Sequence, residues 1–172
     1  MLAGQQGLRL SLAGAQDKLP VVVADDGSIG LPLRNVYSLV EAGGLTAIGR
    51  VSATPPSRIG AAPGDVLYVV GVIGDAGLGL EIAMGKRQGP EALLNAYHRP
   101  LPLLDSGRLL AGHVTAMMDV SDGLLIDAFR LAEASHVTLA IDGAAVPVAA
   151  PDRRLECLTW GDDYELLFTL PT

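Results

Sequence analysis

The sequence predicts a mixed α/β fold in which helices cover a small sheet. Short apolar runs alternate along the chain with stretches of helical spacing, which is typical of layered strands and helices. The 172 residues are 49% hydrophobic and have a mean hydropathy of +0.38, so the chain is able to bury a substantial core. Its 21 glycines and 11 prolines are scattered without a period, which indicates turns between short elements.

The beginning of the chain reads as β structure. Asp26 and Gly27 supply the positive φ angles of a tight turn, and short apolar runs flank them, which predicts a hairpin. Gly43 and Gly44 separate two further β-prone runs. The strand candidates are 8–12, 19–23, 29–33, 36–40 and 45–51. We expect a boundary near residue 35, which divides a β-hairpin segment, 1–35, from a domain, 36–172.

Strands and helices alternate in the rest of the chain. Pro90 suits the first turn of a helix, and Ser121 is expected to cap another helix. The glycine-rich run 71–79 lacks the P-loop pattern, so it serves either close approach to an anion or tight packing. The expected strands are 66–70, 115–120, 137–141 and 164–170, and the expected helices are 78–84, 90–97, 107–113 and 123–134.

Composition excludes several classes of partner. A formal charge of −7, with only 12 Lys and Arg spread along the chain, argues against binding to nucleic acid or to an anionic membrane. The single cysteine, Cys157, excludes an intramolecular disulfide and a cysteine-based zinc site. No apolar run approaches the roughly 20 residues of a membrane span. A cytoplasmic protein is therefore expected.

The strongest local motif is Asp119-Val120-Ser121-Asp122-Gly123, which lies where a predicted strand passes into a helix. Two carboxylates three residues apart at such a turn suit a hard cation such as Mg²⁺. Ser121 and the N–H groups of the helix start suit phosphate oxygens. The motif alone also fits a helix cap beside an ordinary acid in the first turn.

Residues from about 45 to 172 resemble the carboxy-terminal half of the thiamine-monophosphate kinases, a family in the superfamily of aminoimidazole ribonucleotide synthetase. Several segments match the family's motifs in the same order along the chain. They are 58–65 (RIGAAPGD), 71–80 (GVIGDAGLGL), 99–102 (RPLP), 119–124 (DVSDGL), the strand and Val-Pro turn of 135–147, and 161–169 (GDDYELLFT).

This resemblance implies a synthetase C-terminal-domain-like mixed sheet and an activity. The activity is the transfer of a phosphoryl group from ATP, with Mg²⁺, to thiamine monophosphate, which gives thiamine diphosphate. Asp119 and Asp122 would bind Mg²⁺, Ser121 would contact ATP, and Arg58 would neutralise charge on the nucleotide phosphates. Asp162 stands where the family contacts thiamine phosphate, usually through a glutamate. The predicted hairpin would have exposed strand edges, and unpaired edges recruit partners, so we also expect a homodimer.

The family's amino-terminal half, with its acidic metal ligands and G-G-D-T nucleotide motif, has no counterpart in the sequence. We therefore expect the isolated chain to be weak or inactive, with the missing acids supplied by a partner. The alternative is a catalytically inactive truncated or chimeric module that folds and self-associates.

The first segment resembles a different family. Residues 11–20 (SLAGAQDKLP) resemble a motif of toxin serine/threonine kinases from bacterial persister modules, whose glycine-containing loop lies over ATP phosphates. This resemblance extends over about 27 residues, and no downstream residues match that family's catalytic aspartate. A β-hairpin that covers apolar surface explains the same segment.

Overall fold

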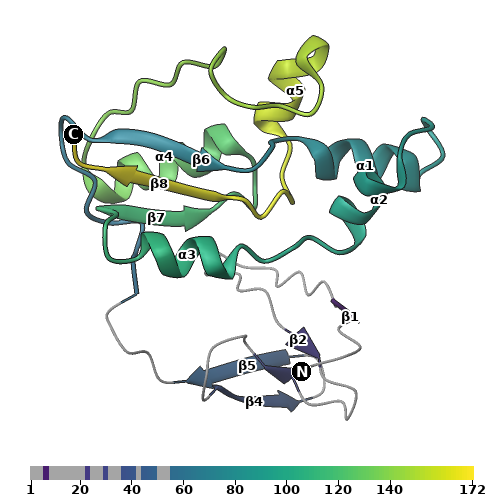
Figure 1. Cartoon of the computed structure of the whole chain (residues 1–172), viewed down its shortest axis with the longest axis horizontal. Helices are drawn as coiled ribbons and strands as arrows, with labels where there is room; N and C mark the ends of the chain where they lie inside the picture. Colours follow the sequence, from purple (N-terminus) through teal and green to yellow (C-terminus); the bar gives the residue numbers. More distant parts are fainter. Residues whose placement is uncertain (1–5, 8–21, 24–28, 31–35, 42–43, 50–54) are drawn as a thin grey trace. The chain divides into compact units, whose positions relative to one another are not determined.

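A computed structural model describes residues 6–7, 22–23, 29–30, 36–41, 44–49 and 55–172. The chain divides into two compact units, Met1–Pro55 and Pro56–Thr172, which are described separately (Figure 1). The boundary expected near residue 35 adjoins residues outside the described part, so it stays a prediction.

The first unit contains two small antiparallel sheets. One has the strand order β1-β2-β3 and the other pairs β4 with β5. The strands are β1 (Gln6–Gly7), β2 (Val22–Val23), β3 (Ile29–Gly30), β4 (Val36–Glu41) and β5 (Gly44–Gly49). Val22 pairs with Gly30 in antiparallel fashion, as the predicted hairpin requires, and Val36 pairs with Gly49, so the strand candidates 36–40 and 45–51 form an antiparallel pair. The Asp26-Gly27 turn lies outside the described residues.

The second unit is a mixed layer of helices and a three-stranded sheet, as the sequence predicts. Its strands are β6 (Val66–Val70), β7 (Ala116–Asp119) and β8 (Leu166–Leu170). Its helices are α1 (Asp75–Ala83), α2 (Glu91–His98), α3 (Leu104–Leu110), α4 (Leu124–Ser135), the short 3₁₀ helix η1 (Pro151–Arg153) and α5 (Arg154–Thr159).

Strand β8 is central in this sheet, with β6 and β7 antiparallel to it on either side. Helix α4 covers one face, where Leu124, Ala128 and Leu131 form a core with Leu167 of β8 (Figure 1). In the register, Val70 and Asp119 both lie opposite Leu166. The carboxyl ends of β6 and β7 and the beginning of β8 therefore meet at one end of the sheet.

The glycine-rich run after β6 serves packing in the described structure. A Cβ on Gly79 would lie 2.0 Å from the carbonyl oxygen of Leu93, so this glycine lets α1 approach the backbone of α2. A Cβ on Gly77 would lie 2.1 Å from the Trp160 ring. Both glycines belong to α1, which begins at Asp75 and so starts three residues before the predicted helix.

Two local predictions are wrong. Residues 137–141 form no strand, although Val137, Leu139 and Ile141 pack against the core. Apolar alternation reports that one side of a segment is buried, and burial does not require a ladder of backbone hydrogen bonds. The edge of β7 is instead bonded by Ser57, whose carbonyl oxygen accepts the N–H of Met117 at 2.8 Å.

Ser121 is not the amino-terminal cap of α4. The cap position is Gly123, with a φ of 121°, and it has no side-chain capping bond. The N–H groups of Ser121 and Asp122, before the helix, are instead bonded to the carboxylate of Asp127 in its first turn, so the motif has a different geometry from the one predicted.

Candidate functional site

Acidic side chains gather at the sheet end where β6 and β7 finish and β8 begins. The register places Asp119 at this end, because it is the last residue of β7 and lies opposite Leu166. The other acids come from the loops and helix starts that adjoin the same end. They are Asp75, Asp122, Asp162, Asp163 and Glu165.

The loop from Asp119 to Gly123 is held by backbone hydrogen bonds to Asp127. The N–H groups of Ser121 and Asp122 donate to Asp127 Oδ2 at 2.9 and 2.8 Å. Asp127 has no exposed surface, so this acceptor lies inside the protein. The N–H groups of Ser121 and Asp122 are therefore already bonded, which leaves the hydroxyl of Ser121 for a ligand.

Arg130 joins the two carboxylates of this region. Its Nη1 donates to Asp127 Oδ1 at 2.9 Å and also forms a short ion pair with Asp122 Oδ2. The side chains of Arg130 and Asp122 are 39% and 42% exposed, whereas that of Asp127 is fully buried. These hydrogen bonds, the one to Asp122 first, raise the pKa of Arg130 above its ordinary value. Asp127 and Arg130 both lie outside the motif from which the site was predicted.

The segment before β8 is pressed against this loop. The N–H of Asp162 donates to the carbonyl oxygen of Ser121 at 2.8 Å, and that of Tyr164 donates to Val120 at 2.8 Å. Asp162 and Tyr164 have positive φ angles of 71° and 55°. A positive φ is uncommon for residues other than glycine and is strained for a bulky one, and such strain concentrates at functional sites. The structure therefore brings the backbone of Asp162 beside that of Ser121.

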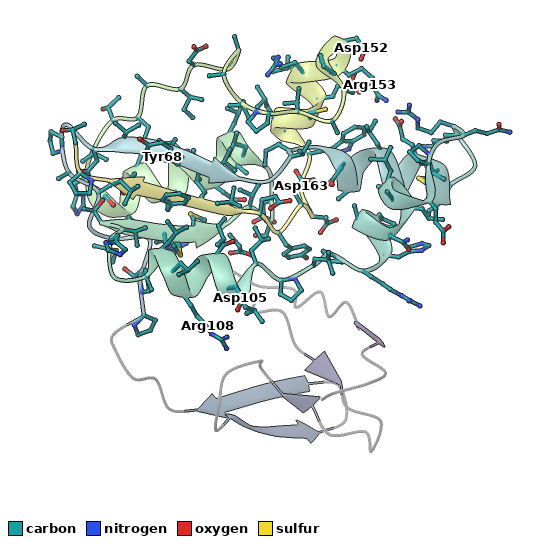
Figure 2. The ribbon with its side chains drawn as sticks, viewed as in Figure 1. Tyr68, Asp105, Arg108, Asp152, Arg153 and Asp163 are labelled. Atoms are coloured by element: carbon teal, nitrogen blue, oxygen red, sulfur yellow. The ribbon has the colours of Figure 1, made fainter. Side chains whose placement is uncertain are left out.

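The side chain of Asp163 points toward the start of α1 (Figure 2). Its carboxyl accepts the N–H groups of Gly74 and Ala76 at 2.8 and 3.3 Å. Burial, together with the neighbouring charge of Asp75, raises the pKa of Asp163 to about 8. Burial also raises the pKa of Asp75, which shares a hydrogen bond with Asp163. Asp163 is thus a buried acid that ties the approach to β8 to the start of α1.

Glu165 lies against the bend after β6. A Cβ on Gly71 would lie 2.1 Å from the Glu165 carboxyl, so glycine makes room for it. Burial and the charge of Asp75 raise the pKa of Glu165 to about 7. Within the part of the chain that the structure describes, Glu165 Oε2 is buried without a hydrogen-bond partner. The sequence analysis missed Asp163 and Glu165, because only tertiary contacts reveal that they are buried.

Arg58 is not carried toward the acidic end by its backbone. Ser57 is bonded to Met117, and a Cβ on Gly60 would touch the carbonyl oxygen of Thr115. The chain from 57 to 60 therefore runs toward the beginning of β7, away from Asp119. Ser135 holds this turn through its hydroxyl, which donates to the carbonyl oxygen of Arg58 at 3.0 Å. Arg58 itself is exposed.

The ligand atoms available at the acidic end are of the type that binds magnesium. They are carboxylate oxygens, the ligands that hard cations prefer, and the orphaned Glu165 Oε2 shows that acidic oxygen is buried there in excess of hydrogen-bond donors. They do not form a complete site. Over the described residues, no group of three or more His, Cys, Asp or Glu side chains is placed to hold a metal ion. Asp119 and Asp122 would supply two ligands.

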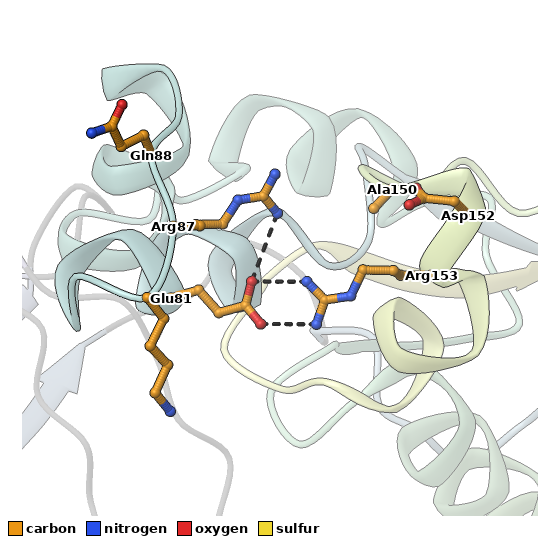
Figure 3. Close-up of a pocket in the computed structure, with 7 residues that line it drawn as sticks. Glu81, Arg87, Gln88, Ala150, Asp152 and Arg153 are labelled. Atoms are coloured by element: carbon orange, nitrogen blue, oxygen red, sulfur yellow. Dashed lines mark hydrogen bonds and ion pairs between the residues drawn. The ribbon is translucent and has the colours of Figure 1, made fainter.

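A separate pocket of about 510 Å³ lies between the end of α1 and η1 (Figure 3). Glu81 is at its centre and forms two hydrogen bonds of 2.8 Å with Arg153 and an ion pair of 3.7 Å with Arg87. The Arg153 guanidinium also lies 5.0 Å from the centre of the Trp160 ring. None of the residues that line this pocket belongs to the acidic end of the sheet. The pocket and the predicted site are therefore different places.

A search of the described helices for a membrane-spanning segment finds none of sufficient length and apolar character.

Known proteins resemble this chain over its C-terminal part. The thiamine-monophosphate kinase of Escherichia coli (strain K12) is 34% identical, over 81% of this chain and 50% of the relative. That of Aquifex aeolicus (strain VF5) is 33% identical, over 66% of this chain and 42% of the relative. The chain thus spans about half the length of these curated relatives or less.

Solved structures give the same result for the fold. A thiamine monophosphate kinase crystal structure from Aquifex aeolicus has a TM-score of 0.67 and 30% identity, covering 74% of this chain and 48% of its own. A structure described as AaThiL complexed with AMPPCP and TMP has a TM-score of 0.61 and 32% identity, covering 66% and 41%. The mixed α/β fold is thus confirmed. These similarities give no support to the toxin-kinase resemblance of residues 11–20, which lie outside the described part.

The profile of the family described as AIR synthase related protein, C-terminal domain, matches residues 62–171. This match extends from the turn before β6 to the end of β8 and so includes the whole acidic end of the sheet. The chain belongs to this family, and its C-terminal part resembles that of the thiamine-monophosphate kinases.

Proposed function

We propose that the chain takes part in the ATP- and magnesium-dependent transfer of a phosphoryl group to thiamine monophosphate, which gives thiamine diphosphate. The observation that carries the proposal is the meeting of the 119–123 and 161–165 segments at one end of the sheet. Two motifs about 40 residues apart in the sequence thereby contribute acids to one place. The similarity to thiamine-monophosphate kinases, one of them complexed with AMPPCP and TMP, supports this assignment.

In this proposal each residue has a distinct task. Asp119 and Asp122 bind Mg²⁺ through their carboxylates, because hard cations prefer oxygen ligands. The magnesium ion that they would hold would supply positive charge to the phosphate oxygens, and such electrostatic stabilisation is a main part of phosphoryl-transfer catalysis. The Ser121 hydroxyl contacts ATP, and Asp162, beside it, contacts the thiamine phosphate.

Arg58 has the least direct support among these residues. A guanidinium makes paired hydrogen bonds with phosphate oxygens, which suits the proposed role. Its backbone, however, runs toward the other end of β7. In this proposal the long side chain of Arg58 therefore reaches the nucleotide phosphates from a position away from the acids.

The acids of this chain make half of a multi-magnesium site. Two carboxylates leave a magnesium ion mostly hydrated, since the ion takes six ligands in octahedral geometry. The proposal therefore includes further acids from a partner, which is a second copy in a homodimer or another chain. We expect weak turnover or none from the isolated chain and retain nucleotide binding as the property to measure.

The test is calorimetric titration of the full chain with AMPPCP, with and without Mg²⁺, for the wild type and Asp119→Asn. We expect binding that depends on Mg²⁺ and falls about tenfold in the variant, because one of two carboxylate ligands is lost. Asp105→Asn is the control, since Asp105 is exposed on α3. Equal affinity with and without Mg²⁺, or equal affinity of the wild type and Asp119→Asn, would contradict the proposed metal site.

A further inference from the structure

Arg130 occupies one oxygen of an acid to which the proposed function assigns Mg²⁺. Its Nη1 bonds to Asp122 Oδ2 and to Asp127 Oδ1, so one nitrogen bridges the two carboxylates. Asp127 is immobilised, because it is fully buried and its other oxygen accepts the N–H groups of Ser121 and Asp122. The guanidinium is therefore held by a fixed anchor on one side and extends to a half-exposed carboxylate on the other.

A divalent cation at Asp122 would meet this guanidinium directly. Two positive charges at one carboxylate repel each other, and the contact with Arg130 already uses one of the oxygens that a cation would take. Arg130 and Asp122 are both partly exposed, so either side chain has room to move toward solvent. The ion pair has to open, at least in part, before Asp122 becomes a full ligand.

We propose that Arg130 is an internal counter-ion that competes with a divalent cation for Asp122, so that cation binding requires its displacement. This inference rests on the proposed function for the assignment of Asp122 as a cation ligand. It goes beyond that function because it gives the chain a residue that weakens its own metal site. In the free protein Arg130 is paired with both Asp122 and the buried Asp127.

The opposite role for Arg130 is to orient Asp122 for the cation. The two roles differ in the sign of one measurable effect. A positioning residue strengthens cation binding, so its loss weakens the binding. A competing counter-ion weakens cation binding, so its loss strengthens it. Arg130 Nη1 is bonded to Asp122 Oδ2, so its positive charge lies at an oxygen that the cation would use. This contact favours competition.

The experiment is a titration of the full chain with Mn²⁺, followed by the loss of the electron paramagnetic resonance signal of the free ion. Removal of Arg130 alone would leave the buried Asp127 without its cation and would endanger folding. We therefore use the double variant Asp127→Asn, Arg130→Gln. The introduced amide oxygen accepts the N–H groups of Ser121 and Asp122 in place of Oδ2, so the loop keeps its backbone bonds.

The expected result is Mn²⁺ binding about three- to fivefold tighter than in the wild type, the size of effect that partly exposed ion pairs give. Adding Asp122→Asn to the double variant is expected to abolish the gain. Arg108→Gln is the matched control, since it removes another arginine from an i,i+3 pair with an aspartate on a helix, and it should leave the Mn²⁺ affinity unchanged.

Each other outcome has a definite meaning. If the wild type binds Mn²⁺ through Asp119 and the double variant binds it equally or more weakly, the competition is refuted and the proposed metal site survives. If neither protein binds Mn²⁺, both proposals fail. If the gain appears but AMPPCP binding stays independent of metal, the competition holds and the proposed function fails.

Discussion

Helices α1 and α4 begin in nearly the same way and differ in the charge around their first turns. Each follows a strand and has a glycine with positive φ at its cap position, Gly74 at 92° and Gly123 at 121°. Near each start, the carboxylate of one aspartate accepts hydrogen bonds from two backbone N–H groups. The accepting residue is Asp163 at α1 and Asp127 at α4.

The environments of the two aspartates are different. Asp127 is bonded to Arg130, whereas Asp163 lies beside another acid, Asp75, and its pKa rises to about 8. A carboxylate thus accepts two backbone N–H groups near both helix starts, with an arginine bonded to it at α4 and a second acid beside it at α1. The comparison teaches that the backbone demands an acceptor at each place, and that the tertiary neighbours decide which charge lies beside that acceptor.

The largest expected effect concerns the two glycines. A Cβ on Gly123 would lie 2.7 Å from the carbonyl oxygen of Thr159, and one on Gly74 would lie 2.5 Å from Cys157 Cβ, both in α5. We expect Gly123→Ala and Gly74→Ala each to lower the free energy of unfolding by more than about 3 kcal/mol, since steric overlap adds to backbone strain. Urea denaturation measures this decrease in the free energy of unfolding.

The control for the glycines is Gly64→Ala. Gly64 has a φ of 100°, but an added Cβ would meet nothing within 4 Å. Its substitution should cost only the backbone strain, of order 1–2 kcal/mol. Equal losses at all three positions would show that strain alone matters and that the shared contact with α5 does not.

An intermediate effect is expected from the loss of Asp127, the acceptor that is bonded to Arg130. Asp127→Ala leaves two partly buried N–H groups without their acceptor and removes one of the two carboxylates bonded to Arg130, so we expect a loss of about 2–4 kcal/mol in the free energy of unfolding. Asp105→Ala removes the partner of Arg108, a pair in which the Asp105 side chain is 95% exposed, and should change stability little. Similar losses in the two variants would show that burial of Asp127 contributes nothing.

The smallest expected effect depends on pH. Asp163 binds its proton more tightly in the folded than in the unfolded state, so its contribution to stability is complete at acidic pH and is lost as pH rises from about 4 through about 8. The free energy of unfolding should therefore be lower at pH 8 than at pH 5, and urea denaturation at the two pH values measures the decrease.

Asp163→Asn should make this decrease shallower, while part of it persists because the pKa of Glu165 is also raised, to about 7. A wild type whose stability rises between pH 5 and 8 would show that neither Asp163 nor Glu165 holds its proton in the folded state.

Local sequence signals were sufficient for most elements of the fold. The apolar run of β6 and the helix between Pro90 and Pro100 each contain their own boundaries in turn residues and prolines. The strand predicted at 137–141 is wrong because alternation records burial alone. The start of α1 was placed too late because its glycines discourage a helix locally, although contacts with Leu93 and Trp160 favour glycine there.

Part of the candidate site was predicted, because some of its residues stand in local sequence motifs. Asp119, Ser121, Asp122 and Asp162 stand in short motifs, and the structure brings the two motifs together. Asp163 and Glu165 look like ordinary acids near a strand, and the raised pKa values appear only once burial is known. Arg130 gains its importance from reaching back to Asp122, eight residues earlier.

The sequence by itself determined the family, the alternation of strands and helices, and the acids of the two motifs, because these depend on residue type and spacing along the chain. The tertiary structure alone decided which acids lose their water, which N–H groups are already bonded, and which cation lies at Asp122. The physical reason is that desolvation and charge pairing act between residues distant in sequence, so no local pattern records them.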